Sequence, residues 1–358
     1  MDSDGPNPPQ PRSRRSRRVR RLVPALIGLA IVAAIFGFAL PKIASYRAVL
    51  DVVSGLTWEW WLALAGAVVL NVLTFAPPWA VALPGLGFRR ALVLTQASTA
   101  VSSVLPGGEA VGLGLSMGMM RSWGFPAEAL TAAIAIVGGL NIVAKVVLPA
   151  VAVILVLATG GGGGLLAILS AIGIVIVTGL LVAVALTLRD ESSTLRLGLR
   201  IDRLFTWARG LFRRGASAAV GTRLVQFRRE LVVVLRRRWL SLSVWTLIGH
   251  LSVFVVLLVS ARAVGISSDE VHTVDLFAGW ALTRLLTAVP ITPGGLGIVE
   301  LGLTGALLAA GGDQEEVVAA VLLFRALTWL PTIVLGAISA LVWRRVGRKT
   351  PVPGAQAP

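Results

Sequence analysis

Two short stretches decide how the hydrophobic segments of this chain are organised: LPGGE at residues 105–109 and TPGGLGIVE at residues 292–300. Each interrupts a hydrophobic segment near its middle and places a carboxylate within a few residues. Proline lacks an amide donor and clashes with the preceding turn, and glycine tolerates almost any backbone angle, so a helix must stop and restart there. In hydrocarbon, a broken helix persists only where it is buried in protein or lines a wet cavity. Matching interruptions in two halves of a chain predict a transporter's binding site.

The composition is that of an integral membrane protein. Of the 358 residues, 56% are hydrophobic and 14% are charged, whereas about a quarter of a soluble domain is charged. The chain has no cysteine and only two histidines, His250 and His272, which excludes disulfides, thiolate nucleophiles and a metal centre rich in cysteine or histidine. No cofactor is expected. The net charge of +16 invites a nucleic-acid interpretation, but the basic residues cluster between hydrophobic spans, as membrane topology predicts, so we expect no nucleic-acid partner.

The hydrophobic runs predict an all-α polytopic fold with about six transmembrane helices. The basic tail 1–21 should be disordered, a transmembrane domain should cover 22–346, and 347–358 should be a second tail. The first run is longer than a typical signal-peptide core and lacks a convincing cleavage site, which favours an uncleaved span. The predicted spans cover residues 22–40, 58–83, 126–159, 165–188, 239–261 and 317–343.

The two interrupted segments, 91–120 and 276–310, have arms shorter than the roughly 20 residues that a crossing needs. They therefore predict re-entrant hairpins, with pairs of full crossings left open as the alternative. If the N-terminus is cytoplasmic, all basic loops lie inside and the acidic loops near 269–275 and 313–316 lie outside. The hairpins then enter from opposite sides, which is an inverted-repeat arrangement. We expect a bacterial inner-membrane protein with both termini in the cytoplasm.

A strongly basic segment separates the two halves. Residues 189–238 contain 13 arginines and four acidic residues, a net charge of +9. Apolar residues recur there at helical spacing, which predicts two basic amphipathic helices lying on an anionic leaflet. A solvated arginine-rich linker is the alternative.

Several ionisable side chains fall within apolar segments, where each costs at least about 2.5–3.5 kcal/mol and should face a partner or water. Glu109 starts a half-helix, where exposed amides favour an anion, and Glu300 should lie about one and a half turns into its own half-helix. The amides after each break would bind a lipid phosphate, with arginines adding charge-assisted bonds. The alternative is that the glycines serve close packing and the charges form internal salt bridges. The candidate substrate-binding residues are Pro106, Gly107, Gly108, Glu109, Lys145, Arg284, Pro293, Gly294, Gly295, Glu300 and Arg325.

Other polar residues in apolar segments have weaker signals. His250 is expected to be a packed, hydrogen-bonded residue rather than a proton relay. Asn141 and Lys145 share one helix face and are candidates for lining a cavity. A hydroxyl stripe at helical spacing is explained equally well by a cavity lining or by bonds between helices; it comprises Thr95, Ser98, Thr99, Ser102 and Ser103.

The second break and the segment after it carry a family resemblance. PITPGGLGIVELGLTGALLAAGG at 290–312 and FRALTWLPTIVLG at 324–336 resemble the C-terminal signature of the flippase-like transmembrane region of lysylphosphatidylglycerol synthases. VLPGGEAVGLGLSMGMMRSWGF at 104–125 resembles that family's first block, although the arginine that commonly precedes Gly-Glu is absent here. The likeness covers about residues 60–345.

The resemblance implies a helical membrane domain that moves, or helps to move, phospholipids between leaflets. In bifunctional relatives a soluble aminoacyl-transferase domain follows the membrane part, whereas only residues 347–358 follow the last span here, too few for a domain. Synthase activity is therefore not expected.

The sequence is compatible with three classes of function. The leading hypothesis is translocation of a phospholipid or polyprenyl-type lipid, with the basic segments contacting the anionic leaflet and a homo-oligomer left open. The second is a non-transporting partner or scaffold for an envelope lipid- or glycan-modifying enzyme, docking through 189–238. The third is an intramembrane enzyme, which is disfavoured because the sequence contains no recognisable catalytic constellation.

Overall fold

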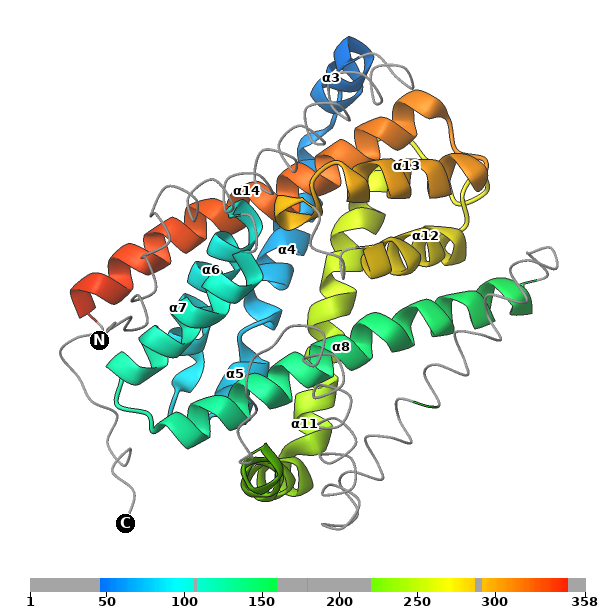
Figure 1. Ribbon diagram of the computed structural model, residues 1–358. Helices are drawn as coiled ribbons and strands as arrows, with labels where there is room; N and C mark the ends of the chain where they lie inside the picture. Colours follow the sequence, from blue (N-terminus) through cyan, green and yellow to red (C-terminus); the bar gives the residue numbers. More distant parts are fainter. Residues whose placement is uncertain (1–45, 106–107, 160–178, 180–219, 287–291, 347–358) are drawn as a thin grey trace, which may run out of the picture.

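A computed structural model describes residues 46–105, 108–159, 179, 220–286 and 292–346. Every regular element in these ranges is a helix, so the all-α prediction is confirmed (Figure 1). The elements are α3 (Tyr46–Ser54), α4 (Trp58–Thr74), α5 (Pro77–Ala82), α6 (Gly87–Val104), α7 (Gly108–Ser122), α8 (Ala127–Ala158), α11 (Val220–Ala263), α12 (Thr273–Leu286), the 3-10 turn η2 (Pro293–Gly295), α13 (Ile298–Ala309) and α14 (Gln314–Val346).

Within the described ranges, four helical segments are long and apolar enough to cross a membrane, and they coincide with four predicted spans. They are Trp58–Ala82, Ala127–Ala158, Arg237–Ala263 and Gln314–Trp343. The chain is therefore a multi-pass membrane protein. The two other predicted spans, at 22–40 and 165–188, lie outside the described residues, as do both predicted tails.

The first of these spans is made of two helices that join at a pair of prolines. Helix α4 ends at Thr74, and α5 restarts at Pro77 with Pro78 directly after it. Proline is well suited to the first helical turn because the amide it lacks would have no partner there. The pair still forms one apolar segment, so the kink redirects the span without ending it.

The basic segment differs from its prediction at its C-terminal end. Helix α11 begins at Val220 and continues into the span without a break, whereas residues 220–238 were expected in a separate amphipathic helix. Figure 1 shows the early part of α11 running at an angle to the span. The first predicted amphipathic helix falls outside the described residues.

Helices α6 and α7 form the first hairpin. Helix α6 ends at Val104, followed by an extended Leu105, and α7 starts at Gly108. A Cβ added at Gly108 would lie 2.5 Å from the Ser102 carbonyl oxygen, and one at Gly112 would collide with the Ser102 hydroxyl. The arms touch here, and only small residues permit that approach. The close-packing explanation of Gly108 therefore holds.

Helices α12 and α13 form the second hairpin. A Cβ built on Gly279 of α12 would lie 3.2 Å from the Ala306 side chain of α13, so these arms also contact each other. At the open end of this hairpin, the Asp313 amide donates to Glu270 Oε1 at 2.8 Å. This bond ties the loop before α12 to the loop after α13.

The two hairpins meet tip to tip. A Cβ added at Gly294 in the second break would lie 3.0 Å from the carbonyl oxygen of Ser103, just before the first break. The open ends are far apart, because α14 begins beside the second hairpin and its Trp343 indole donates to Ser122 Oγ, at the end of α7, over 2.9 Å. Its 33 residues span about 50 Å at 1.5 Å each. The hairpins thus enter from opposite ends of the bundle, as the inverted arrangement predicts.

Two apolar clusters form the core, one around each hairpin. The cluster around α12 and α13 includes Trp280, Leu303 and Phe324, while the cluster around α6 and α7 includes Leu94, Met119 and Leu130. The hairpin tips lie between these clusters, which is where a polar cavity can be held within an otherwise apolar bundle.

The orientation of the bundle can be tested by labelling. Because the chain has no cysteine, a Ser268→Cys protein and an Ala127→Cys protein each carry one thiol at an exposed position near opposite ends. The positive-inside rule places the arginine-rich end in the cytoplasm. We expect a membrane-impermeant maleimide added to intact cells to label the first protein and to label the second only after permeabilisation. The reverse pattern would contradict the predicted orientation.

Candidate functional site

A cavity of about 810 Å³ opens where the hairpin tips meet. Residues from both hairpins line it, together with residues of α4, α5, α8, α11 and α14. Its charged lining residues in the described ranges are Glu109, Lys145, Arg284 and Arg325. The structure thus brings four of the sequence-predicted side chains, from four different helices, around one space.

The backbone of the second break explains its glycines. Gly294, Gly295 and Gly297 have φ angles of 59°, 69° and 83°. This left-handed region is readily adopted only by glycine. Helix α13 then begins at Ile298, so Glu300 is its third residue, whereas the sequence pattern predicts a position about one and a half turns in. That estimate was wrong because the three glycines delay the restart of the helix.

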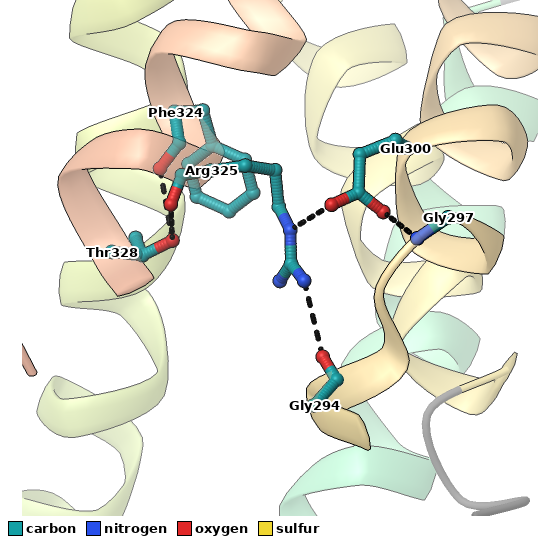
Figure 2. A network of polar contacts seen from close by, with 6 residues as sticks. All are labelled: Gly294, Gly297, Glu300, Phe324, Arg325 and Thr328. Carbon is teal, nitrogen blue, oxygen red and sulfur yellow. Dashed lines mark hydrogen bonds and ion pairs between the residues drawn. The ribbon is translucent and has the colours of Figure 1, made fainter. Parts of the chain in front are cut away.

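Glu300 and Arg325 form a buried clamp around this break (Figure 2). Glu300 Oε1 accepts from Arg325 Nε at 2.7 Å, and its Oε2 accepts from the Gly297 amide at 2.7 Å. Arg325 Nη2 donates to the Gly294 carbonyl at 3.1 Å. The Glu300 side chain is 0% exposed. Through its bonds to Glu300 and Gly294, Arg325 of α14 contacts both the first turn of α13 and the glycine turn before it.

This clamp changes the role expected for the second half-helix. The amides after each break were predicted to bind a lipid phosphate, but the Gly297 amide already donates to the carboxylate of Glu300. Neither Glu300 nor Gly295 lines the cavity. Arg325 does line it, and the clamp uses only its Nε and Nη2 nitrogens (Figure 2). The salt-bridge alternative therefore describes Glu300, while Arg325 belongs both to the clamp and to the cavity wall.

The first break presents a different surface to the cavity. Glu109 is the second residue of α7, where the helix dipole favours a carboxylate, and it lies exposed at the cavity wall. Pro106 and Gly107 lie outside the described residues. Gly108 is buried against α6 and does not line the cavity.

Lys145 and the hydroxyl stripe also face this cavity. Lys145, on α8, makes no hydrogen bond or ion pair with the residues that the structure describes. In a membrane protein such a cation must be satisfied by water or by a ligand. All five residues of the stripe line the cavity: Thr95, Ser98, Thr99, Ser102 and Ser103.

His250 and Asn141 both line the cavity, and His250 links three helices there. Arg284 Nη2 of α12 lies 2.9 Å from His250 Nδ1, and His250 Nε2 lies 2.9 Å from Asn141 Oδ1 of α8. Because arginine can only donate, Nδ1 is the acceptor and the ring is the neutral Nε2–H tautomer. Asn141 in turn donates to the Val137 carbonyl at 2.8 Å. The packed, hydrogen-bonded interpretation of His250 agrees with this geometry, which also holds Arg284 in place.

Replacing His250 tests this positioning role. We expect His250→Leu to lower the free energy of unfolding by about 1–3 kcal/mol, because it removes the acceptor of Arg284 and the donor of Asn141 at a buried site. His250→Gln retains one acceptor and one donor and should recover much of that loss. Thermal unfolding in detergent measures both variants. Equal destabilisation by leucine and glutamine would show that ring packing against Phe75, with centroids 5.9 Å apart, matters more than the hydrogen bonds.

Sequence reasoning missed several polar groups of the cavity wall. Trp280, Trp329, Gln96 and Thr246 line the cavity, and each has a buried side-chain nitrogen or oxygen with no hydrogen-bond partner in the described part of the chain. Tryptophans in apolar helices have the same sequence pattern as core residues, so no local signal separates the two roles. Arg284 also stacks on Trp280, with Cζ 5.3 Å from the ring centroid.

Comparison with known proteins agrees with the helical architecture. A family model described as "Lysylphosphatidylglycerol synthase TM region" matches residues 25–336. No curated protein matches the chain significantly.

Proposed function

Because this chain belongs to the lysylphosphatidylglycerol synthase TM-region family, a group of membrane proteins linked to lipid handling, we propose that it translocates a phospholipid or lipid-linked substrate between leaflets. The observation that carries the proposal is the cavity at the meeting point of the two hairpins, with Lys145, Arg284 and Arg325 on its wall. A lipid headgroup needs such a polar path through the apolar interior, while its tails remain in lipid.

The geometry supports binding of a phosphate group in this cavity. Lysine and arginine make strong charge-assisted bonds to phosphate oxygens. Lys145 has no partner among the described residues, and Arg325 Nη1 is not used by the clamp. The hydroxyl stripe of α6 adds further polar groups for the sugar or glycerol part of a headgroup.

The arrangement also suits alternating access. The two hairpins enter from opposite ends and touch at Gly294 and Ser103, so separation of the tips toward either end would open the cavity to one leaflet at a time. We propose that the protein acts as a transporter rather than as an enzyme. Bilayer phospholipid is its direct partner under this proposal.

Reconstitution tests the proposal. The purified protein is reconstituted into vesicles that contain phospholipid with an NBD label on one acyl chain. Dithionite added outside should quench the label from the inner leaflet faster in these vesicles than in protein-free vesicles. Lys145→Gln should slow this exchange about tenfold or more, since it removes a charge-assisted bond. Arg121→Gln removes one positive charge from an exposed site outside the cavity and should leave the rate unchanged.

The outcomes separate the transporter from a scaffold. Exchange no faster than in protein-free vesicles, with and without a proton gradient, would overturn the proposal and favour a non-transporting membrane partner. Equally fast exchange by the wild-type and Lys145→Gln proteins would contradict a role for this cavity in translocation. Conversion of the headgroup without exchange would indicate an enzyme.

A further inference from the structure

The cavity wall contains buried hydrogen-bond donors that have no partner in the described part of the chain. The indole N–H groups of Trp280 and Trp329 and the hydroxyl of Thr246 are buried without a hydrogen-bond partner among the residues described. An indole N–H can only donate. A buried donor without an acceptor is costly in a nonpolar medium. These groups therefore favour a ligand that brings acceptors.

The charged residues on the wall also favour a ligand with negatively charged or acceptor groups. Lys145, Arg284 and Arg325 face the cavity, and Glu109 is the one acidic residue among its described lining residues. Glu300, the other carboxylate among the predicted site residues, does not line the cavity. In the structure it is 0% exposed, and its two oxygens are committed to Arg325 and Gly297. A cationic headgroup thus has no access to this carboxylate.

The acceptors on the wall include the Glu109 carboxylate, the hydroxyl groups and one buried amide oxygen. Gln96 Oε1 is buried on the wall without a partner, while Gln96 Nε2 donates to the Val72 carbonyl at 3.3 Å. Asn141 Oδ1 lies 2.9 Å from His250 and is already engaged. The wall can thus accept a hydrogen bond from a hydroxyl group through Gln96 while donating to several oxygens elsewhere.

From these observations we propose that the cavity selects a headgroup with a net negative phosphate ester and free hydroxyls, of the glycerophosphate or sugar-phosphate class, and discriminates against headgroups that carry an amino group. This inference rests on the proposed function and names the substrate class of the same site. Lys145 and Arg325 Nη1 contact the phosphate, and the indole N–H groups donate to its oxygens or to neighbouring ester oxygens. Gln96 Oε1 accepts from a headgroup hydroxyl.

A lipid panel with identical acyl chains tests the selectivity. The panel contains phosphatidylglycerol, phosphatidylethanolamine and an aminoacyl ester of phosphatidylglycerol, which are anionic, zwitterionic and cationic. Binding is measured by the thermal stabilisation of the full-length protein in detergent on titration with each lipid, and exchange by dithionite quenching in vesicles. We expect phosphatidylglycerol to bind at least tenfold more tightly than the aminoacyl ester and to exchange faster.

Matched substitutions test the donors individually. Trp329→Phe and Trp280→Phe keep an aromatic ring and remove only the N–H, so each should weaken phosphatidylglycerol binding about fivefold or more while changing aminoacyl-ester binding less. Trp61→Phe makes the same change at an exposed site outside the cavity and should have no effect. Lys145→Glu, which reverses one charge, should remove the preference for the anionic lipid.

The readouts distinguish this inference from the proposed function. Equal binding of all three lipids, or tighter binding of the aminoacyl ester, would overturn the inference even if exchange is rapid. Tight, selective binding of phosphatidylglycerol without exchange would support the inference and overturn the transport proposal. Competition by millimolar sn-glycerol 1-phosphate would show that a free phosphate ester also satisfies the site. If the lipid binds and sn-glycerol 1-phosphate does not compete, the acyl chains are part of the recognised ligand. Competition and its absence are both consistent with recognition of a phosphate ester.

Discussion

Replacement of Arg325 by alanine is expected to lower the free energy of unfolding by about 3–5 kcal/mol, since it leaves a buried carboxylate without its charge partner. Glu300 is 0% exposed and accepts from Arg325 Nε at 2.7 Å. The same substitution releases the Gly294 carbonyl that Arg325 Nη2 holds. The turn of the second break should therefore loosen together with the first turn of α13. Thermal or chemical unfolding in detergent measures the loss.

A double substitution separates the charge from the packing. Glu300→Gln keeps an acceptor for the Gly297 amide and removes the negative charge. The Glu300→Gln/Arg325→Ala protein should therefore be more stable than the Arg325→Ala protein, although it carries one more change. Arg121→Ala, at an exposed position, should cost less than about 0.5 kcal/mol. Equal stability of the single and double variants would contradict the buried-charge explanation.

Glu300 and Arg325 also allow a test of whether the clamp takes part in lipid exchange. Where both the Glu300→Gln and Arg325→Ala proteins fold, their exchange rates separate a purely structural clamp from a substrate contact. Because Arg325 lines the cavity and Glu300 does not, we expect Arg325→Ala to slow exchange much more than Glu300→Gln. Unchanged exchange in both would remove the clamp from the transport mechanism.

Replacement of Gly336 by leucine is the second large effect, with an expected loss of about 3 kcal/mol from overpacking. Helix α14 passes so close to α6 at this residue that an added Cβ would collide with Ala100 and lie 2.6 Å from the Gln96 carbonyl oxygen. The Gln96 contact is with backbone, which has no rotamer to change. Helix α14 would have to move away from α6, which carries the hydroxyl stripe and Gln96.

Gly139 provides the matched control. It is an exposed glycine of α8, and nothing lies within 4 Å of a Cβ built on it. Gly139→Leu should be neutral or slightly stabilising, because leucine is the better helix former by about 1 kcal/mol or less. Unfolding in detergent and the exchange assay compare the two proteins. Similar stabilities would show that α14 can shift without cost and would contradict the tight contact.

The breaks were predictable because their causes are local. Proline and paired glycines stop a helix wherever they occur in an apolar segment, and the angles at Gly294, Gly295 and Gly297 confirm this. The kink at Pro77 and the ends of four spans follow from neighbouring residues in the same way. The position of Glu300 in α13 was wrong because it depended on how many glycines the turn uses.

The partners of the charged residues were not predictable because they depend on contacts between helices far apart in sequence. Glu300 joins Arg325 rather than Lys145 or Arg284, and Arg284 joins His250. Which of these side chains meet is decided by the rotation and spacing of packed helices, which small residues such as Gly336 and Gly112 set at single points.

By itself the sequence determined the membrane-spanning helical architecture, the two interrupted helices and the presence of charges that need partners in the bilayer, because hydropathy and backbone stereochemistry act over a few residues. Only the tertiary structure decided which charge is sealed in a clamp and which remains on the cavity wall. It also showed that indole groups of Trp280 and Trp329 belong to that wall. The physical reason is that burial and hydrogen-bond partners depend on the position of every neighbouring helix, which no local pattern specifies.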